Sequence, residues 1–457
     1  MTWTKNLLKF LNTVNDFFFI NYIVNILKWM KGYGSIFINR YININIQQFF
    51  KKHSKDIEFS SVEENKSVEL LCNNISSDEP KELLHDYFSE LPVEVILQIL
   101  KYLDLKSLYR MCRVNKYFND LAQNPMLYTS FRLHSYELHC YKNITGKDLL
   151  KLLETSRYKH LKKVEIDNTD RFSSWEVLSL ILTYGSSLTC LYLCFTEDTN
   201  IDNITGTISI KCKNLKELKI SKCGKHITEK GFLCLANLQF LEYFALSQSY
   251  ITTTTLCKIV QNNHRLRHLA ITYSFSNIDL VDVFKKLKKY CPNLEIVDFH
   301  GYMNISTMRY FDQLSECKNL REVNFNSRYT RTYKTEDSAS FRHFLSSCQY
   351  LEKICLQRHK GFTDHDLKAL ALCKNLKYLD LTGIQTLTAN TCHSIFKHCP
   401  KLEFIDLTFC NNISDSLIKQ WQEEHSHVTI RRMDEKDQIE DIFVPFDFMT
   451  NIRFYGI

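Results

Sequence analysis

The sequence predicts an α/β solenoid in which each repeat supplies one short strand and one helix, with a small helical module in front. Three observations support this fold class. An apolar pattern returns at a nearly constant interval through the second two-thirds of the chain. A dense apolar stretch with helix-start signals precedes it. The 457 residues are too many for one compact core, and 11 Gly and 6 Pro are too few for collagen-like or Gly/Pro-rich disordered chains.

The repeat is the pattern L-x-x-[LVIF]-x-[LIF], which occurs ten times from residue 161 onward. The pattern alternates with period 2, so it predicts a strand whose apolar side chains share one face. Stretches between the strands, such as residues 278–287, are apolar at i, i+3 and i+6 and predict helices. The first leucines of the ten patterns are Leu161, Leu188, Leu215, Leu241, Leu266, Leu294, Leu320, Leu351, Leu376 and Leu402.

One strand and one helix cannot bury their apolar sides alone, so neighbouring units must stack. The spacing predicts about ten to eleven repeats of roughly 27 residues, a period of the leucine-rich-repeat type. We expect a horseshoe with the strands on its concave face and the helices on its convex face. A fold of this kind positions a long concave surface for binding.

Many of the 17 cysteines keep a fixed place in the repeat. Six lie three residues before a first leucine, and Cys223 and Cys410 lie eight residues after one. No C-x-x-C pair occurs, so we expect buried packing residues with free thiols rather than metal ligands or disulfides. The six are Cys212, Cys291, Cys317, Cys348, Cys373 and Cys399.

Residues 84–130 predict three short helices. Pro92 suits the first turn of a helix, where its missing N–H costs nothing. Asp104 and Asn115 are N-cap candidates for the second and third helices. The apolar stripe of the first helix is wider than a lone surface helix needs, so we expect part of it to face a partner.

This stretch resembles the F-box, through L-P-x-E at 91–94, I-L-x-Y-L-D-L at 99–105 and C-R-V-N-K-x-F at 112–118. The resemblance implies a small helical hook that docks on the Skp adaptor of a cullin–RING ubiquitin ligase. One departure is Tyr128, where the family often has Trp. The positions that match the adaptor-facing surface are Leu91, Pro92, Ile96, Ile99, Leu100 and Val114. A module that only caps the exposed end of the repeats is the alternative.

An F-box followed by cysteine-type repeats resembles the F-box/leucine-rich-repeat family. The resemblance implies a substrate receptor of an SCF ubiquitin ligase, with Skp, cullin and RING subunits as partners and a protein substrate marked for proteasomal degradation. It implies no catalysis, cofactor or metal in this chain. We find no H-E-x-x-H, P-loop, G-x-S-x-G or Rossmann motif.

The alternative function is a repeat scaffold that binds protein or nucleic acid outside a ligase. It rests on the net charge of +7 and on seven lysines between residues 211 and 230. Because we find no Arg–aromatic interleaving, we expect no nucleic-acid partner.

Strand positions two, four and six after the first leucine point away from the core, so they predict the substrate surface. Aromatic side chains beside a few charges are typical of binding hot spots, and the acids favour a basic target segment. The candidates are Tyr192, Tyr243, Tyr378, Asp380, Phe404 and Asp406. A solvated strand face that tolerates aromatics is the alternative.

The remaining segments flank these two modules. Residues 1–83 predict an N-terminal extension and polar linker, residues 131–433 the solenoid, and residues 434–457 an acidic and aromatic tail that either covers the concave face or frays. Residues 1–50 carry five basic residues and one acid, which leaves mitochondrial targeting as an alternative to a cytoplasmic or nuclear location. No stretch there is apolar and long enough to predict a membrane span.

Overall fold

The computed structural model describes residues 92–103, 105–133, 145–166, 173–195, 201–224, 226–301, 309–326, 338–359 and 361–433. The chain divides into two compact units, Met1–Leu127 and Tyr128–Ile457. We describe each unit by itself. Leu91, Asp104, residues 1–83 and the tail after residue 433 lie outside the described residues.

The first unit holds three short helices, α5 (Val93–Leu100), α6 (Leu105–Met111) and α7 (Lys116–Ala122). Asn115 caps α7 as expected, because its Oδ1 accepts a 2.8 Å hydrogen bond from the backbone N–H of Phe118. Pro92 occupies the N-cap position of α5, one residue earlier than the first-turn position that the sequence predicts. A 3₁₀ turn, η2 (Pro125–Tyr128), leads into the second unit.

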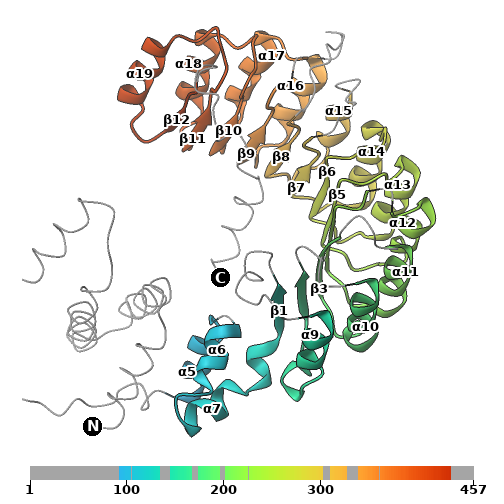
Figure 1. The fold of residues 1–457 in the computed structure, drawn as a ribbon. Coiled ribbons are helices and arrows are strands. Elements are labelled where there is room, and N and C mark those ends of the chain that lie inside the picture. Colours follow the sequence, from blue (N-terminus) through green and yellow to red (C-terminus); the bar gives the residue numbers. More distant parts are fainter. Residues whose placement is uncertain are drawn as a thin grey trace, which may run out of the picture. The chain divides into compact units, whose positions relative to one another are not determined.

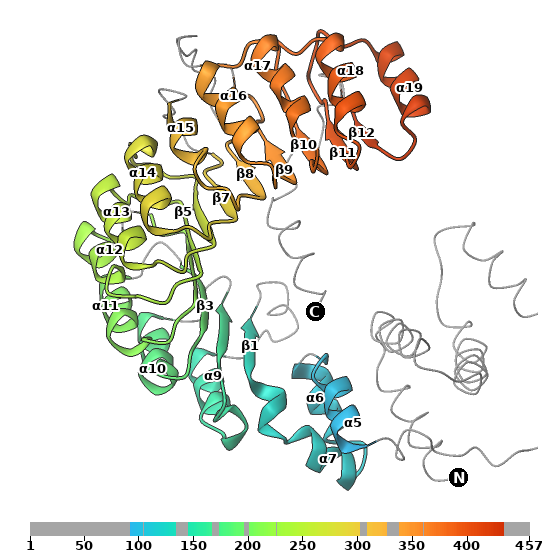
Figure 2. The same ribbon diagram turned by 180° about the vertical axis from the view of Figure 1, so that it is seen from behind.

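The second unit is one parallel sheet whose 12 strands follow each other in sequence order, so the predicted solenoid of strands and helices is confirmed. Figures 1 and 2 show the strands along the inner side of this unit's arc and the helices along its outer side. The strands are β1 (Ser130–Leu133), β2 (Lys163–Ile166), β3 (Cys190–Cys194), β4 (Glu217–Ser221), β5 (Tyr243–Ser247), β6 (His268–Thr272), β7 (Ile296–Asp298), β8 (Glu322–Asn324), β9 (Lys353–Cys355), β10 (Tyr378–Asp380), β11 (Phe404–Asp406) and β12 (Thr429–Arg431).

A helix or 3₁₀ turn lies between each pair of neighbouring strands. These elements are α9 (Gly146–Leu153), η4 (Ser156–Tyr158), α10 (Ser174–Tyr184), α11 (Ile201–Lys211), α12 (Glu229–Leu235), α13 (Thr253–Asn262), α14 (Leu280–Tyr290), α15 (Tyr310–Leu314), α16 (Ser338–Ser347), α17 (Asp364–Lys368), η7 (Ala369–Leu372), α18 (Ala389–His398) and α19 (Asp415–Glu424).

The sheet has two strands more than the ten leucine patterns. The additional strands are β1 and β12, one at each end of the sheet. Each pairs on one side only within the described sheet, so its sequence need not follow the pattern of the inner strands. Phe131 and Ile430 still place a buried apolar side chain at the position that Val164 and Ile405 occupy in the neighbouring strands.

The repeat core forms as the pattern predicts. All ten first leucines are at most 1% exposed, and so are the apolar residues three positions later. Because strand partners pair in register, these side chains stack directly from repeat to repeat. Full burial of one such Leu, Val or Ile side chain contributes about 1.5–3 kcal/mol, so the stacked columns account for much of the stability of the unit.

The strand ends are fixed by a recurring left-handed turn. The residue seven positions after a first leucine has φ near +50 to +73° in most repeats. Two of these residues are glycines, Gly301 and Gly383, which reach this conformation without steric cost. The turn directs the chain out of the sheet toward the next helix.

The repeat-locked cysteines are buried, as their spacing predicts. The six that precede a first leucine are at most 3% exposed and are free thiols. Among them, Cys348 Sγ donates to the carbonyl of Leu314 at 3.5 Å and Cys399 Sγ to that of Leu370 at 3.5 Å. Each of these carbonyls also accepts a backbone N–H, from Cys317 and Cys373, so the thiol shares an acceptor that is already bonded.

No helix among the described residues combines the length and apolarity that a bilayer crossing needs.

Candidate functional site

The inner face of the solenoid presents two columns of side chains that run across the strands. We call the residues two positions after each first leucine the first column, and those four positions after it the second column. The register places Glu217, Tyr243 and His268 next to each other in the first column, and Asp380 beside Asp406 in the second. All six candidate substrate residues therefore lie on this face.

Three aromatic side chains gather on β3, β5 and β6. The rings of Tyr192 and Tyr243 lie 5.7 Å apart, and that of Tyr243 meets His268 edge to face at 4.3 Å. Burial lowers the pKa of His268 to about 4, so this imidazole is neutral at physiological pH. The cluster is an apolar surface without its own charge.

Polar partners hold Tyr192 in one orientation. Its hydroxyl donates a 2.6 Å hydrogen bond to Glu217, and the Lys163 ammonium lies 5.2 Å from the ring centroid. Burial and then the nearby Cys190 and Glu217 raise the pKa of this phenol. The ring therefore stays protonated and fixed, as a pre-organised binding surface requires.

A second aromatic pair lies on β10 and β11. Tyr378 and Phe404 are register partners, and their rings stack at 4.6 Å with an interplanar angle of 9°. Lys353 of β9 places its ammonium 4.9 Å from the Tyr378 centroid. Both rings are half-buried, so each keeps part of its surface open. The sequence analysis missed Lys353, which stands one strand earlier in the same column.

The two acids beside this pair have a structural task. Asp380 and Asp406 are each 7% exposed, and each accepts a hydrogen bond from the backbone N–H two residues on, at Thr382 and Thr408. Burial, and then the neighbouring Asp406, raise the pKa of Asp380. These carboxylates hold the backbone at the ends of their strands. Their use in binding a basic target segment stays a prediction.

The same hydrogen bond from the backbone to a side-chain oxygen recurs at the ends of β7 and β8. Asp298 accepts from the backbone N–H of His300 and lies 2.7 Å from His300 Nδ1, while Asn324 accepts from Asn326. Burial favours the neutral acid, but the charge and hydrogen bonds of His300 outweigh it and lower the pKa of Asp298. A side-chain oxygen four positions after the first leucine therefore recurs in this role on β7, β8, β10 and β11.

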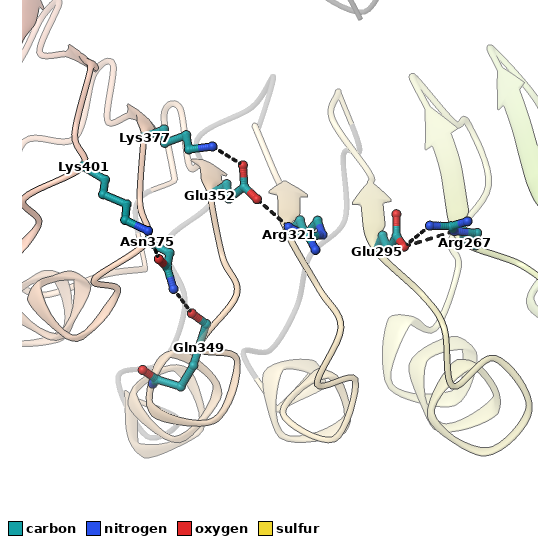
Figure 3. Close-up of polar contacts among 8 residues, drawn as sticks. All are labelled: Arg267, Glu295, Arg321, Gln349, Glu352, Asn375, Lys377 and Lys401. Atoms are coloured by element: carbon teal, nitrogen blue, oxygen red, sulfur yellow. Dashed lines mark hydrogen bonds and ion pairs between the residues drawn. The ribbon is translucent and has the colours of Figure 1, made fainter. Parts of the chain in front are cut away.

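An alternating row of charges borders the face where the strands begin. Glu352 accepts hydrogen bonds from Arg321 at 2.6 Å and Lys377 at 2.8 Å, and Arg267 pairs with Glu295 (Figure 3). These residues stand one position after the first leucine in successive repeats. Reading that single column of the sequence would have found the alternation. Glu352 faces two cations and Glu295 faces one, so these five residues together leave a net charge of +1 at this border.

The helical unit places the adaptor candidates in two environments. Ile96, Ile99 and Leu100 are at most 8% exposed, while Pro92 is exposed and Val114 is half-buried. Three of the proposed adaptor-facing side chains therefore lie inside this chain's own core, because they form the inward stripe of α5. This corrects the expectation that these three exceed what the helices can bury.

Other apolar side chains of the same unit are exposed and were not singled out from the sequence. They are Val93 at 43%, Tyr102 at 60%, Tyr109 at 63%, Tyr117 at 40% and Met126 at 60%. Val93, Tyr109 and Tyr117 lie on one helix each, whereas Tyr102 follows α5 and Met126 lies in η2. Their spacing is not periodic enough to reveal them, because burial there depends on how the helices pack.

Within the described ranges, no group of three or more His, Cys, Asp or Glu side chains is arranged to hold a metal ion.

Comparisons with known proteins bear on both units. A family model described as F-box-like matches residues 88–134. F-box/LRR-repeat protein 4 of Bos taurus is 25% identical over 285 residues, which cover 62% of this chain and 45% of that relative. F-box/LRR-repeat protein 21 of Bos taurus is 24% identical over 423 residues, which cover 84% of this chain and 89% of the relative. The chain thus spans less than half of the first relative and most of the second.

Among solved structures, a chain titled "Crystal structure of Rad7 and Elc1 complex in yeast" matches with a TM-score of 0.44 and 16% identity, covering 84% of this chain and 97% of that one. The chain thus has an F-box-like domain followed by a leucine-rich-repeat solenoid, and it is similar to F-box/LRR-repeat proteins over most of its length.

Proposed function

We propose that the chain is the substrate-recognition subunit of an SCF-type ubiquitin ligase. The F-box-like domain at residues 88–134, followed by a solenoid of parallel strands, is the observation that carries the proposal. The domain docks the Skp adaptor and the solenoid holds the target. Cullin and RING subunits join through the adaptor.

The chain itself is non-catalytic in this proposal. Holding a target lysine near a charged conjugating enzyme raises its effective concentration and so speeds ubiquitin transfer. The rigid aromatic side chains on the concave face supply binding area at low entropic cost, which suits recognition rather than chemistry.

Adaptor docking is tested by co-purification of the full-length chain with Skp. Leu91→Ala together with Pro92→Ala should lower the recovered adaptor at least tenfold, while the far-ultraviolet circular dichroism stays unchanged. Trp175→Ala is the matched control, because Trp175 is 63% exposed on the solenoid. Full adaptor recovery by the folded double variant would contradict the receptor role and favour the alternative of a repeat scaffold outside a ligase.

Target capture is tested on the stacked pair of β10 and β11. The wild type first captures its targets in cells under cullin-pathway inhibition. Tyr378→Ala with Phe404→Ala should then reduce the ubiquitination of these targets once the inhibitor is removed, with adaptor binding intact. Trp175→Ala, which removes an exposed ring on α10, is the control. Unchanged ubiquitination of every captured target would place the substrate site elsewhere.

A further inference from the structure

All helices of the solenoid run in the same direction. Each one links two neighbouring parallel strands, so the helix starts collect along one edge of the unit and the helix ends along the other. Figures 1 and 2 show this common orientation on the outer side of the arc. Any charge preference of helix ends therefore adds up along a whole edge.

The edge at the helix starts is acidic. First-turn acids occur on most of the helices, as expected from the positive end of the helix dipole. They include Glu176, Asp202, Glu229, Asp282, Asp312, Asp364 and Asp415.

The edge at the helix ends is basic, and we call it the basic edge. It consists of exposed cations in the last turn of a helix or in the loop that leads to the next strand. They are Lys211, Lys213, Arg265, Lys288, Lys289, Lys318, Lys374, Lys397 and Lys401. The exposed acids at the same helix ends are fewer, namely Glu154, Glu316, Glu423 and Glu424, and Glu316 pairs with Lys288 at 3.5 Å.

The helix dipole accounts for part of this charge. A cation in the last turn gains about 0.3–1 kcal/mol from the dipole, which covers Lys211, Lys289 and Lys397. Five of the nine cations lie beyond the helices, in the loops. Lys213 and Lys318 each donate one bond to a helix carbonyl, at 2.6 and 2.8 Å, and an ammonium has three donors. The basic edge thus carries more positive charge than the helix dipole favours, and more N–H donors than the helix carbonyls accept.

Exposed apolar side chains lie beside these cations. Phe240 is 41% exposed, Tyr350 56% and Leu372 45%, all in the segments that end a helix or precede a strand. Leu372 is two residues from Lys374 in the chain. Cations and apolar groups on one edge match an interface that offers both anionic groups and hydrocarbon.

The rings on this edge are poorly placed to stack on nucleic-acid bases. The Arg265 guanidinium lies 5.4 Å from the Phe240 centroid, and the Lys289 ammonium 5.1 Å from that of Tyr290. Arg265 is also the one guanidinium among the nine cations of the basic edge, so bidentate base contacts have little support. Lysine-rich charge with apolar neighbours favours a lipid surface instead.

We propose that the basic edge binds the surface of a bilayer that contains anionic phospholipids. The cations contact the headgroups, and Phe240, Tyr350 and Leu372 enter the interfacial region. The solenoid then lies with its helix ends toward the membrane. The concave face stays free for a target because it is a different surface of the same unit.

The probe is co-sedimentation of the full-length chain with vesicles of phosphatidylcholine alone or with 30% phosphatidylserine. The wild type should bind the anionic vesicles more than about a hundredfold more strongly, and 0.5 M NaCl should abolish the difference by screening. Each lysine near an anionic surface contributes roughly a fivefold gain in partitioning, so Lys289→Glu, Lys374→Glu and Lys397→Glu together should lower it about a hundredfold or more.

The matched control reverses three exposed charges away from the basic edge, Lys147→Glu, Lys230→Glu and Lys258→Glu, and should bind like the wild type. Equal binding by the basic-edge variant would overturn the proposal, because other parts of the chain would then carry the attraction. No preference of the wild type for anionic vesicles would also overturn it. So would tighter, edge-dependent binding to single-stranded RNA, which would assign the edge to nucleic acid.

Discussion

Thiol labelling measures how firmly the solenoid core is closed. The six cysteines that precede a first leucine are buried and lie in six different repeats, so together they report on the length of the array from α11 to α18. Burial raises the pKa of Cys212, Cys291 and Cys348 to about 12. Cys317 and Cys399 also reach about 12.

The magnitude follows from the ionised fraction, since the thiolate is the reactive form. At pH 8 a thiol with a pKa of about 12 is ionised in roughly one molecule in 10⁴, whereas a free cysteine with a pKa of about 8.5 is ionised to roughly a quarter. Ionisation alone therefore slows labelling by about 2,000-fold. The reagent must also enter a closed core, which requires local or global opening.

The assay is iodoacetamide labelling of the native full-length chain at pH 8, followed by peptide mass spectrometry. The half-buried Cys112 and Cys234 are the internal controls and should label first. The six should label together once 6 M guanidinium chloride is added. Labelling of the six at the rate of Cys234 in the native chain, or stoichiometric zinc released from it, would refute the packing account.

Three further outcomes are expected. Burial lowers the pKa of His359 to about 4, below the unfolded value of about 6.5, so this residue's contribution to stability should be complete above pH 6.5 and fall by about 3 kcal/mol as the pH drops toward 4. In thermal melts His359→Phe should reduce this dependence of stability on pH, and an unchanged dependence would exclude His359 as its cause. Glu352→Lys places a third cation between Arg321 and Lys377 and should lower the free energy of urea unfolding by about 1–3 kcal/mol. The control Glu423→Lys, on the exposed face of α19, should change it little, and equal losses would show that the row of charges does not stabilise the solenoid. Gly301→Ala should lower the free energy of unfolding by more than about 1 kcal/mol, because φ is +69° and the new Cβ would clash with the neighbouring Tyr273 ring; an unchanged free energy would mean that this turn relaxes freely.

The local sequence pattern was sufficient to predict the repeat. The leucine spacing predicted the strand positions of β2 to β11, because in a solenoid each unit contacts mainly its neighbours and the same local rule applies to each. Asn115 as a helix cap and the cysteines as core residues followed from the same local chemistry. These features need no knowledge of distant residues.

The two terminal strands and the buried face of α5 could be identified only from the tertiary structure. The sequence alone left β1 and β12 out, because a strand paired on one side is not constrained to the full pattern. It also placed Ile96 and Ile99 on a docking surface, whereas the packing of three helices buries them. Which face of a short helix is inward depends on its neighbours and not on its own periodicity.

The amino-acid sequence by itself determined the repeat, its period, its core and the helical module in front, because hydrophobic periodicity acts over one or two turns or strands. Only the tertiary structure decided which side chains share a surface. Tyr378 stacks on Phe404, which is 26 residues away in the sequence, and Arg321 and Lys377 both pair with Glu352. Parallel strands bring these equivalent repeat positions into register. The basic edge arises in the same way, since charges distant in the chain become one surface when every helix points the same way.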